Sequence, residues 1–125
     1  MTSADSNDAL IRGFISAWER RDSAFIIDAF SDDAIYHAMP LTPITGKEAL
    51  RAWVEHFDNV PAVRLEVHHQ VATESVVINE RTDTITLNGK QVTLPICAVF
   101  ELAGGKVTAW REYFDLGPAK AAFSS

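Results

Sequence analysis

Residues 80–85, which read ERTDTI, place the strongest constraint on how this chain can fold. Side chains of a β-strand point to opposite faces in turn, so Arg81, Asp83 and Ile85 share one face of a strand in this segment. Charged and apolar side chains therefore occupy the same face. Because a charged group among apolar neighbours costs free energy unless it is paired, the pattern predicts a buried polar site.

A second strand pattern, residues 109–115 (AWREYFD), places Trp110, Glu112 and Phe114 on one face. The two segments are two hairpin connections apart, and a curved meander can bring their charged residues together. An arginine between two carboxylates can bind both, which leaves one to accept a proton from water and the other to deliver one. Two carboxylates in one apolar pocket tend to have split pKa values, which assigns a base and an acid. A structural ion-pair network would have the same pattern, so both interpretations stay open.

The composition fits one globular domain, residues 1–125, with a single hydrophobic core. Of the 125 residues, 47% are hydrophobic, and the formal net charge is -6. Binding to nucleic-acid phosphates needs clustered lysine and arginine, whereas the 11 in this chain are scattered, so we expect no nucleic-acid partner. Residues 1–8 lack the regions of a secretory signal, and no apolar run is long enough to span a membrane. We therefore expect a cytoplasmic protein with no membrane partner.

The single cysteine and the four histidines form no metal-binding pattern. Cys97 has no partner for an internal disulfide and lies in an apolar run, so we expect a buried core thiol. His68 and His69 are adjacent in a predicted strand and should face opposite ways, while His37 and His56 have no partner at ligand spacing. The sequence also contains no phosphate-binding glycine loop or dinucleotide fingerprint. We therefore expect neither a metal nor another cofactor.

Apolar spacing predicts three helices in the N-terminal half of the chain and strands in most of the rest. The predicted helices cover residues 8–21, 23–30 and 47–57. The predicted strands cover residues 34–38, 63–70, 76–87, 91–102 and 106–115, with turns at 88–89 and 104–105. Candidate caps of the first helix are Asp5, Ser6 and Asn7. The expected fold is α+β, with three N-terminal helices packed on a curved antiparallel or mixed sheet that forms a cone around an internal pocket.

Large apolar residues of these elements are expected to fill the core, and some of them to line the pocket. The candidate lining residues are Trp18, Phe30, Ala38, Trp53, Ile85, Leu94, Ile96, Trp110 and Phe114. Phe25, Phe57 and Phe100 are expected in the core. Tyr36 shares a strand face with Ala38, whereas His37 faces the other way. The Tyr36 hydroxyl can position a water or a substrate oxygen, or the ring can simply be part of the wall.

At these residues the chain resembles the limonene-1,2-epoxide hydrolases. The resemblance rests on residues 35–43 (IYHAMPLTP), 80–83 (ERTD) and 105–115 (GKVTAWREYFD), and it extends in order over nearly the whole chain. That family belongs to the nuclear transport factor 2-like, or cystatin-like, superfamily of α+β cones. The superfamily also includes ketosteroid isomerases, polyketide cyclases and proteins with no catalytic role, so the fold alone does not assign a function. The resemblance also implies a homodimer formed through the outer face of the sheet.

The family's Asp-Arg-Asp constellation adds water to an epoxide without a metal or a covalent intermediate. The resemblance implies that Arg81 is the bridging arginine, Asp83 the acid and Tyr36 the tyrosine that helps to activate water. Two positions depart from the family pattern. Glu112 replaces the base aspartate, which shifts the carboxylate by about an ångström or more, and Ala38 replaces an asparagine that binds the water.

The leading hypothesis is a small cofactor-independent hydrolase that adds water to an apolar epoxide. In this hypothesis Glu112 is the base, Asp83 the acid, Arg81 the bridge and Tyr36 an anchor for water or substrate. One alternative is an isomerase or cyclase that acts on a carbonyl substrate and stabilises an oxyanion. The other is a protein that binds an apolar small molecule and catalyses nothing.

Overall fold

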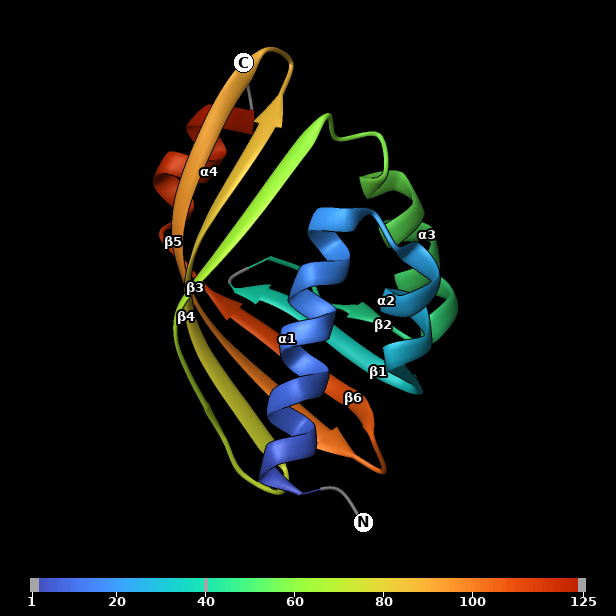
Figure 1. Ribbon diagram of the computed structural model, residues 1–125. Coiled ribbons are helices and arrows are strands. Elements are labelled where there is room, and N and C mark those ends of the chain that lie inside the picture. The colour runs from blue at the N-terminus through green and yellow to red at the C-terminus, as the bar shows by residue number, and fades with distance from the viewer. Residues whose placement is uncertain (1–2, 40, 124–125) are drawn as a thin grey trace.

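A curved sheet carries helices α1, α2 and α3 against one of its faces (Figure 1). The structure is a computed structural model that describes residues 3–39 and 41–123. The helices are α1 (Ala4–Arg20), α2 (Ser23–Ala29), α3 (Lys47–Phe57) and α4 (Leu116–Phe123). The strands are β1 (Phe30–Met39), β2 (Ile44–Thr45), β3 (Ala62–Ala72), β4 (Val76–Leu87), β5 (Lys90–Ala103) and β6 (Lys106–Tyr113). The predicted α+β class is confirmed.

The six strands form one mixed sheet in the order β2-β1-β6-β5-β4-β3. Strands β3 to β6 are an antiparallel meander, and β1 joins it in parallel beside β6. Strands β2 and β3 lie at opposite ends of this order, so the sheet is open and the predicted cone is not closed by hydrogen bonds. The parallel pairing places Tyr36 and Ala38 of β1 in register with Trp110 and Glu112 of β6.

The predicted helices are confirmed in their positions, with differences at the ends. Helix α1 begins earlier than predicted: its N-cap is Ser3, and the candidate cap Ser6 is the N3 residue of the capping box that Ser3 forms. The bounds predicted for α3 are confirmed. Helix α2 ends at Ala29 and continues directly as β1, so residues 31–33 are strand rather than the end of a helix. Strand β2 and helix α4 were not predicted. No helix within the described ranges is both long and apolar enough to cross a membrane.

The hairpins follow the predicted turns. Strand β4 has the predicted bounds, and Asn88 and Gly89 connect it to β5 with positive φ angles of 52° and 76°. An Asn-Gly pair tolerates this left-handed backbone, which matches the twist of a two-residue hairpin. Strands β3 and β5 extend beyond their predicted ends, whereas β6 ends at Tyr113.

The core lies between the sheet and the helices and is centred on Phe14, whose ring packs edge-on against four other aromatic rings. Phe30 is fully buried in this core and does not line the pocket, which corrects its predicted place. Phe25 is exposed rather than buried. Cys97 is exposed as well, because β5 turns Ile96 and Ala98 inward and the residue between them outward.

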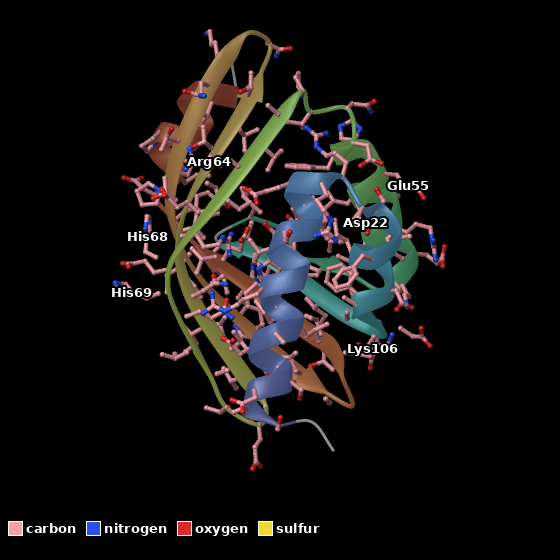
Figure 2. The ribbon with its side chains drawn as sticks, viewed as in Figure 1. Asp22, Glu55, Arg64, His68, His69 and Lys106 are labelled. Atoms are coloured by element: carbon pink, nitrogen blue, oxygen red, sulfur yellow. The ribbon has the colours of Figure 1, made fainter. Side chains whose placement is uncertain are left out.

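A β-bulge in β3 corrects the prediction for the adjacent histidines. Val67 pairs with Arg81, but His69 pairs with Glu80, so His68 is an extra residue in the strand. Both histidine side chains are exposed, on the side of β3 away from α1 (Figure 2). The bulge therefore shifts the alternation of β3 by one residue at this point.

Candidate active site

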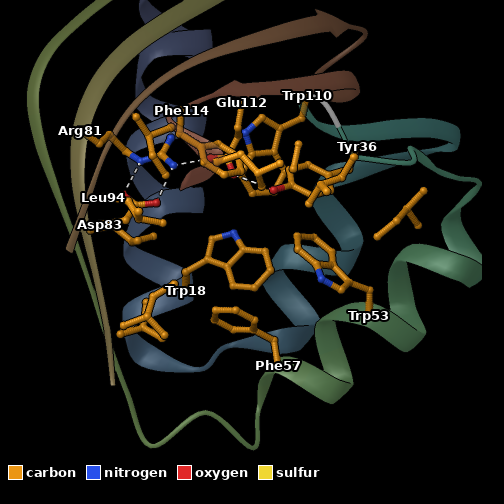
Figure 3. A pocket seen from close by; sticks show the side chains of 18 of the residues that line it. Trp18, Tyr36, Trp53, Phe57, Arg81, Asp83, Leu94, Trp110, Glu112 and Phe114 are labelled. Atoms are coloured by element: carbon orange, nitrogen blue, oxygen red, sulfur yellow. Dashed lines mark hydrogen bonds and ion pairs between the residues drawn. The ribbon is translucent and has the colours of Figure 1, made fainter. Parts of the chain in front are cut away.

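The three charged residues predicted from the sequence meet on the inner face of the sheet (Figure 3). Arg81 and Asp83 come from β4 and Glu112 from β6, with β5 between these strands. Ala98 of β5 is in register with Glu112 and, on its other side, with Asn79. Its small side chain leaves the space that a long arginine needs to cross β5.

Arg81 binds both carboxylates. Its Nε donates to Asp83 Oδ1 at 3.0 Å and its Nη2 to Asp83 Oδ2 at 2.9 Å, a bidentate ion pair. The same Nη2 donates to Glu112 Oε2. Arg81, Asp83 and Glu112 are only 1%, 5% and 6% exposed. Burial alone would lower the pKa of Arg81, but the charge of Glu112 and the hydrogen bonds and charge of Asp83 raise it above its ordinary value. The arginine is therefore a fixed cation.

Tyr36 of β1 completes the group from the neighbouring strand. Its hydroxyl donates to Glu112 Oε1 at 2.7 Å, and its ring stacks on Trp53 at a centroid distance of 4.4 Å. Burial, followed by the charge of Glu112 and the hydrogen bond to it, raises the pKa of Tyr36 well above its ordinary value. Tyr36 therefore stays neutral and donates a proton to this hydrogen bond at physiological pH.

The charges of the group do not cancel. One guanidinium and two ionised carboxylates leave one negative charge in excess in this buried group. Within the described part of the chain, no group of three His, Cys, Asp or Glu side chains is placed to hold a metal ion.

The group lies in the wall of an apolar pocket of about 560 Å³, a volume typical of small-molecule sites. The predicted residues that line it are Trp18, Ala38, Trp53, Ile85, Leu94, Ile96, Trp110 and Phe114, together with Tyr36, Arg81, Asp83 and Glu112. His37 is not among the residues that line the pocket, in agreement with the predicted alternation.

Several lining residues were not predicted from the sequence. They are Leu41, Thr42, Ile44, Phe57, Val63, Leu65, Leu116 and Lys120. Most belong to segments that only the tertiary structure brings to the pocket, namely β2, α4 and the edge strand β3. Asn79, which accepts a hydrogen bond from Arg81 Nη1 at 3.0 Å, was also missed. The signal for it was present, because Asn79 precedes Arg81 by two residues in the same alternating strand.

Comparisons with known proteins place this chain in one family. The model of the family described as limonene-1,2-epoxide hydrolase catalytic domain matches residues 5–121. Epoxide hydrolase EphG of Mycobacterium tuberculosis is 26% identical over 106 residues, which cover 85% of this chain and 71% of that protein.

Two solved structures show the same fold at lower identity. The structure of an M. tuberculosis LEH-like epoxide hydrolase has a TM-score of 0.87 at 23% identity, with 97% of this chain and 91% of the other covered. A nuclear transport factor 2-like protein of unknown function from Burkholderia pseudomallei has a TM-score of 0.80 at 19% identity, with 93% and 94% covered. Since the family model matches most of the sequence, the chain belongs to the limonene-1,2-epoxide hydrolase family and has a nuclear transport factor 2-like fold.

Proposed function

We propose that this protein, as a single domain of residues 1–125, is a cofactor-independent hydrolase that adds water to an apolar epoxide. The observation that carries the proposal is the hydrogen-bonded series Tyr36, Glu112, Arg81 and Asp83 in the wall of an apolar pocket. An apolar pocket with a few convergent polar groups binds a hydrophobic ligand and orients it. The family match and the epoxide hydrolase activity named for the M. tuberculosis relative support the same reaction class.

In the proposed reaction, Glu112 removes a proton from a water molecule whose oxygen bonds to one carbon of the epoxide. The bond between that carbon and the ring oxygen breaks, and Asp83 donates its proton to the departing oxygen. The product is a diol, with Glu112 protonated and Asp83 ionised. Return of the proton from Glu112 to Asp83 through solvent restores the starting state. Arg81 keeps its charge throughout and holds both carboxylates in place.

The two positions expected to depart from the family pattern lie next to each other. Ala38 of β1 is in register with Glu112 of β6, on the same inner face. A small residue at position 38 leaves room for the longer glutamate, whose oxygens contact both Arg81 and Tyr36. This arrangement supports Glu112 as the base, because its carboxylate is held from two sides without help from an asparagine.

The proposal is tested by incubating the protein with a series of apolar epoxides and measuring diol formation by gas chromatography. A β,γ-unsaturated ketone of similar size is assayed in parallel. Diol formation supports the hydrolase. Isomerisation of the ketone without diol formation would contradict the proposal and favour the isomerase alternative. Tight binding of the epoxides with neither reaction would favour a binding protein.

Replacing Tyr36 with phenylalanine is expected to lower kcat for epoxide hydrolysis by about 10- to 100-fold. The change removes one hydrogen bond to a charged carboxylate, which is worth about 1.5–3 kcal/mol, and leaves the ring stacked on Trp53. Steady-state kinetics give kcat and KM, and near-ultraviolet circular dichroism checks that the aromatic packing is retained. An unchanged kcat in a folded Tyr36→Phe variant would show that the hydroxyl takes no part in the reaction.

We also propose that the protein forms a homodimer through the outer face of the sheet, the face opposite to α1, α2 and α3. Tyr113 is 44% exposed there, in register with the exposed Cys97 of β5. Ile78, also exposed, points to the same side of β4. Several exposed apolar side chains on one sheet face are typical of a surface that binds another protein.

Sedimentation velocity is expected to show a dimer that dissociates on dilution. A Tyr113→Glu variant is expected to be a monomer at concentrations at which the unaltered protein is a dimer, since the charge would be buried in the interface. The Cys97 thiol offers a second measurement, because its reaction with a thiol reagent should be slower in the dimer than in that variant. A monomer at every concentration, with equally fast thiol reaction in both proteins, would contradict the homodimer.

A further inference from the structure

A row of hydrogen bonds connects Arg81 to the surface of α1, and no member of this row beyond Arg81 has a role in the reaction proposed above. Arg81 Nη1 donates to Asn79 Oδ1 at 3.0 Å, and Asn79 Nδ2 donates to Gln70 Oε1 at 3.1 Å. Gln70 Nε2 then donates to Asp8, to Oδ1 at 2.9 Å and to the backbone oxygen at 3.2 Å. We call these four residues the Asp8–Arg81 chain.

We propose that Asn79 and Gln70 are positioning residues, which set the orientation of the Arg81 guanidinium between Asp83 and Glu112 through the Asp8–Arg81 chain. The consequence for catalysis rests on the proposed hydrolase function. The orientation of the guanidinium does not, and it is measured independently below.

The direction of the Asp8–Arg81 chain is fixed from both ends. An arginine side chain only donates hydrogen bonds, so Asn79 must turn its oxygen toward Arg81 and its nitrogen toward Gln70. The Asp8 carboxylate only accepts, so Gln70 must turn its nitrogen toward Asp8. The hydrogen bond from Gln70 is the main reason that the pKa of Asp8 is lowered. A flip would break two hydrogen bonds of the Asn79 amide or three of the Gln70 amide.

The bulge at His68 is what brings Gln70 into the Asp8–Arg81 chain. Before the bulge, Leu65 and Val67 face inward, and simple alternation would turn residues 69 and 71 inward. Because His68 is an extra residue, Gln70 faces inward instead and pairs in register with Asn79. The irregularity of β3 therefore has a specific result, which is a polar side chain next to Asn79.

All three nitrogens of the guanidinium donate hydrogen bonds. The edge formed by Nε and Nη2 binds Asp83, Nη2 also binds Glu112, and Nη1 binds Asn79. Because the group is planar and rigid, fixing Nη1 fixes its rotation and so the place of Nη2 between the two carboxylates. Without Asn79, Nη1 would be a buried donor without this acceptor, and the guanidinium would turn to find another. The shared contact with Glu112 would be lost with that turn.

The test compares Asn79→Leu with a matched control, Asn7→Leu. Both asparagines are 1% exposed, but Asn7 donates to the backbone oxygen of Thr73 at 3.0 Å and lies outside the Asp8–Arg81 chain. Gln70→Met is the second test variant, since it removes the middle of the chain and leaves the direct contacts of Arg81 in place. Denaturant unfolding gives the stability of each variant.

Nitrogen NMR of the arginine side chains reports the guanidinium directly, with Arg81 assigned through its Nε and side-chain carbons. The unaltered protein and Asn7→Leu are expected to give separate Nη1 and Nη2 signals for Arg81, because the bound group cannot rotate. The two signals are expected to merge in Asn79→Leu and to broaden in Gln70→Met.

In the epoxide assay, kcat is expected to fall by about 10- to 100-fold in Asn79→Leu and less in Gln70→Met, with KM within about twofold, because misplaced groups lower the rate more than binding.

Separate, unchanged Arg81 signals in a folded Asn79→Leu variant would overturn the proposal. It would also be overturned if the signals merged without a fall in kcat, or if Asn7→Leu lost as much kcat as Asn79→Leu at equal stability. If Asn79→Leu does not fold, Gln70→Met decides by the same criteria. If the unaltered protein hydrolyses no epoxide, the proposed function fails, and the NMR signals still show whether the Asp8–Arg81 chain orients the guanidinium.

Discussion

Replacing Glu112 with glutamine is expected to lower kcat for epoxide hydrolysis by about 10²- to 10⁴-fold, the range found when a general base is removed. The amide has the same shape as the carboxylate but cannot accept a proton from water. Its oxygen can still accept from Arg81, and Tyr36 can still bind its other end, so the fold is expected to be retained. The measurement is kcat and KM for an epoxide that the unaltered protein hydrolyses.

A matched control is Glu101→Gln. Glu101 lies on β5 and binds Arg111, and it does not line the pocket. The same chemical change there is expected to leave kcat within about twofold, because Glu101 does not line the pocket and a partly exposed ion pair contributes at most about 1 kcal/mol to stability. If Glu112→Gln kept most of its activity while still folded, Glu112 would not be the base, and the proposed mechanism would be wrong.

Replacing Arg81 with methionine is expected to destabilise the protein by about 3–5 kcal/mol, the usual cost of breaking a buried ion pair. Two buried carboxylates would lose the cation that binds them both. Lowering the pH should recover part of the loss, because protonating one carboxylate removes a buried charge. In this variant the folded state binds protons more readily than the unfolded state, so stability falls as pH rises.

Urea unfolding at about pH 5 and pH 7 measures this effect. Arg111→Met is the control, because that side chain is 30% exposed and its ion pair with Glu101 is partly in contact with solvent. Its expected cost is below about 1 kcal/mol. An Arg81→Met variant as stable as the control, or one that became less stable as the pH was lowered toward 5, would show that the buried carboxylates do not depend on Arg81.

The charged group of the candidate active site was predictable because it depends on strand alternation, which is a local property. The alternation of β4 and β6 placed Arg81, Asp83 and Glu112 on pocket-facing sides, and the structure places all three in one hydrogen-bonded group. The same rule would have found Asn79. Alternation also corrects the prediction for Cys97, because an apolar run in a strand still has an inner and an outer face.

The features of the site that were not predictable from local sequence depend on contacts between distant segments. The parallel pairing of β1 with β6, which brings Tyr36 to Glu112, has no local sequence signal. Gln70 could not be placed because the bulge at His68 shifts the alternation, and no turn residue marks that bulge. The lining residues of α4 were missed because only the folded chain brings that helix to the pocket.

In the proposed reaction, Glu112 activates a water molecule that attacks the epoxide directly. The most direct test is a single turnover in ¹⁸O-labelled water, with the enzyme in excess over an apolar epoxide, followed by mass spectrometry of the diol. One labelled oxygen is expected in the diol from this first turnover, because the attacking oxygen comes from solvent. An unlabelled diol would mean that a carboxylate oxygen of the protein attacks the epoxide, and the absence of any diol would contradict the proposed function itself.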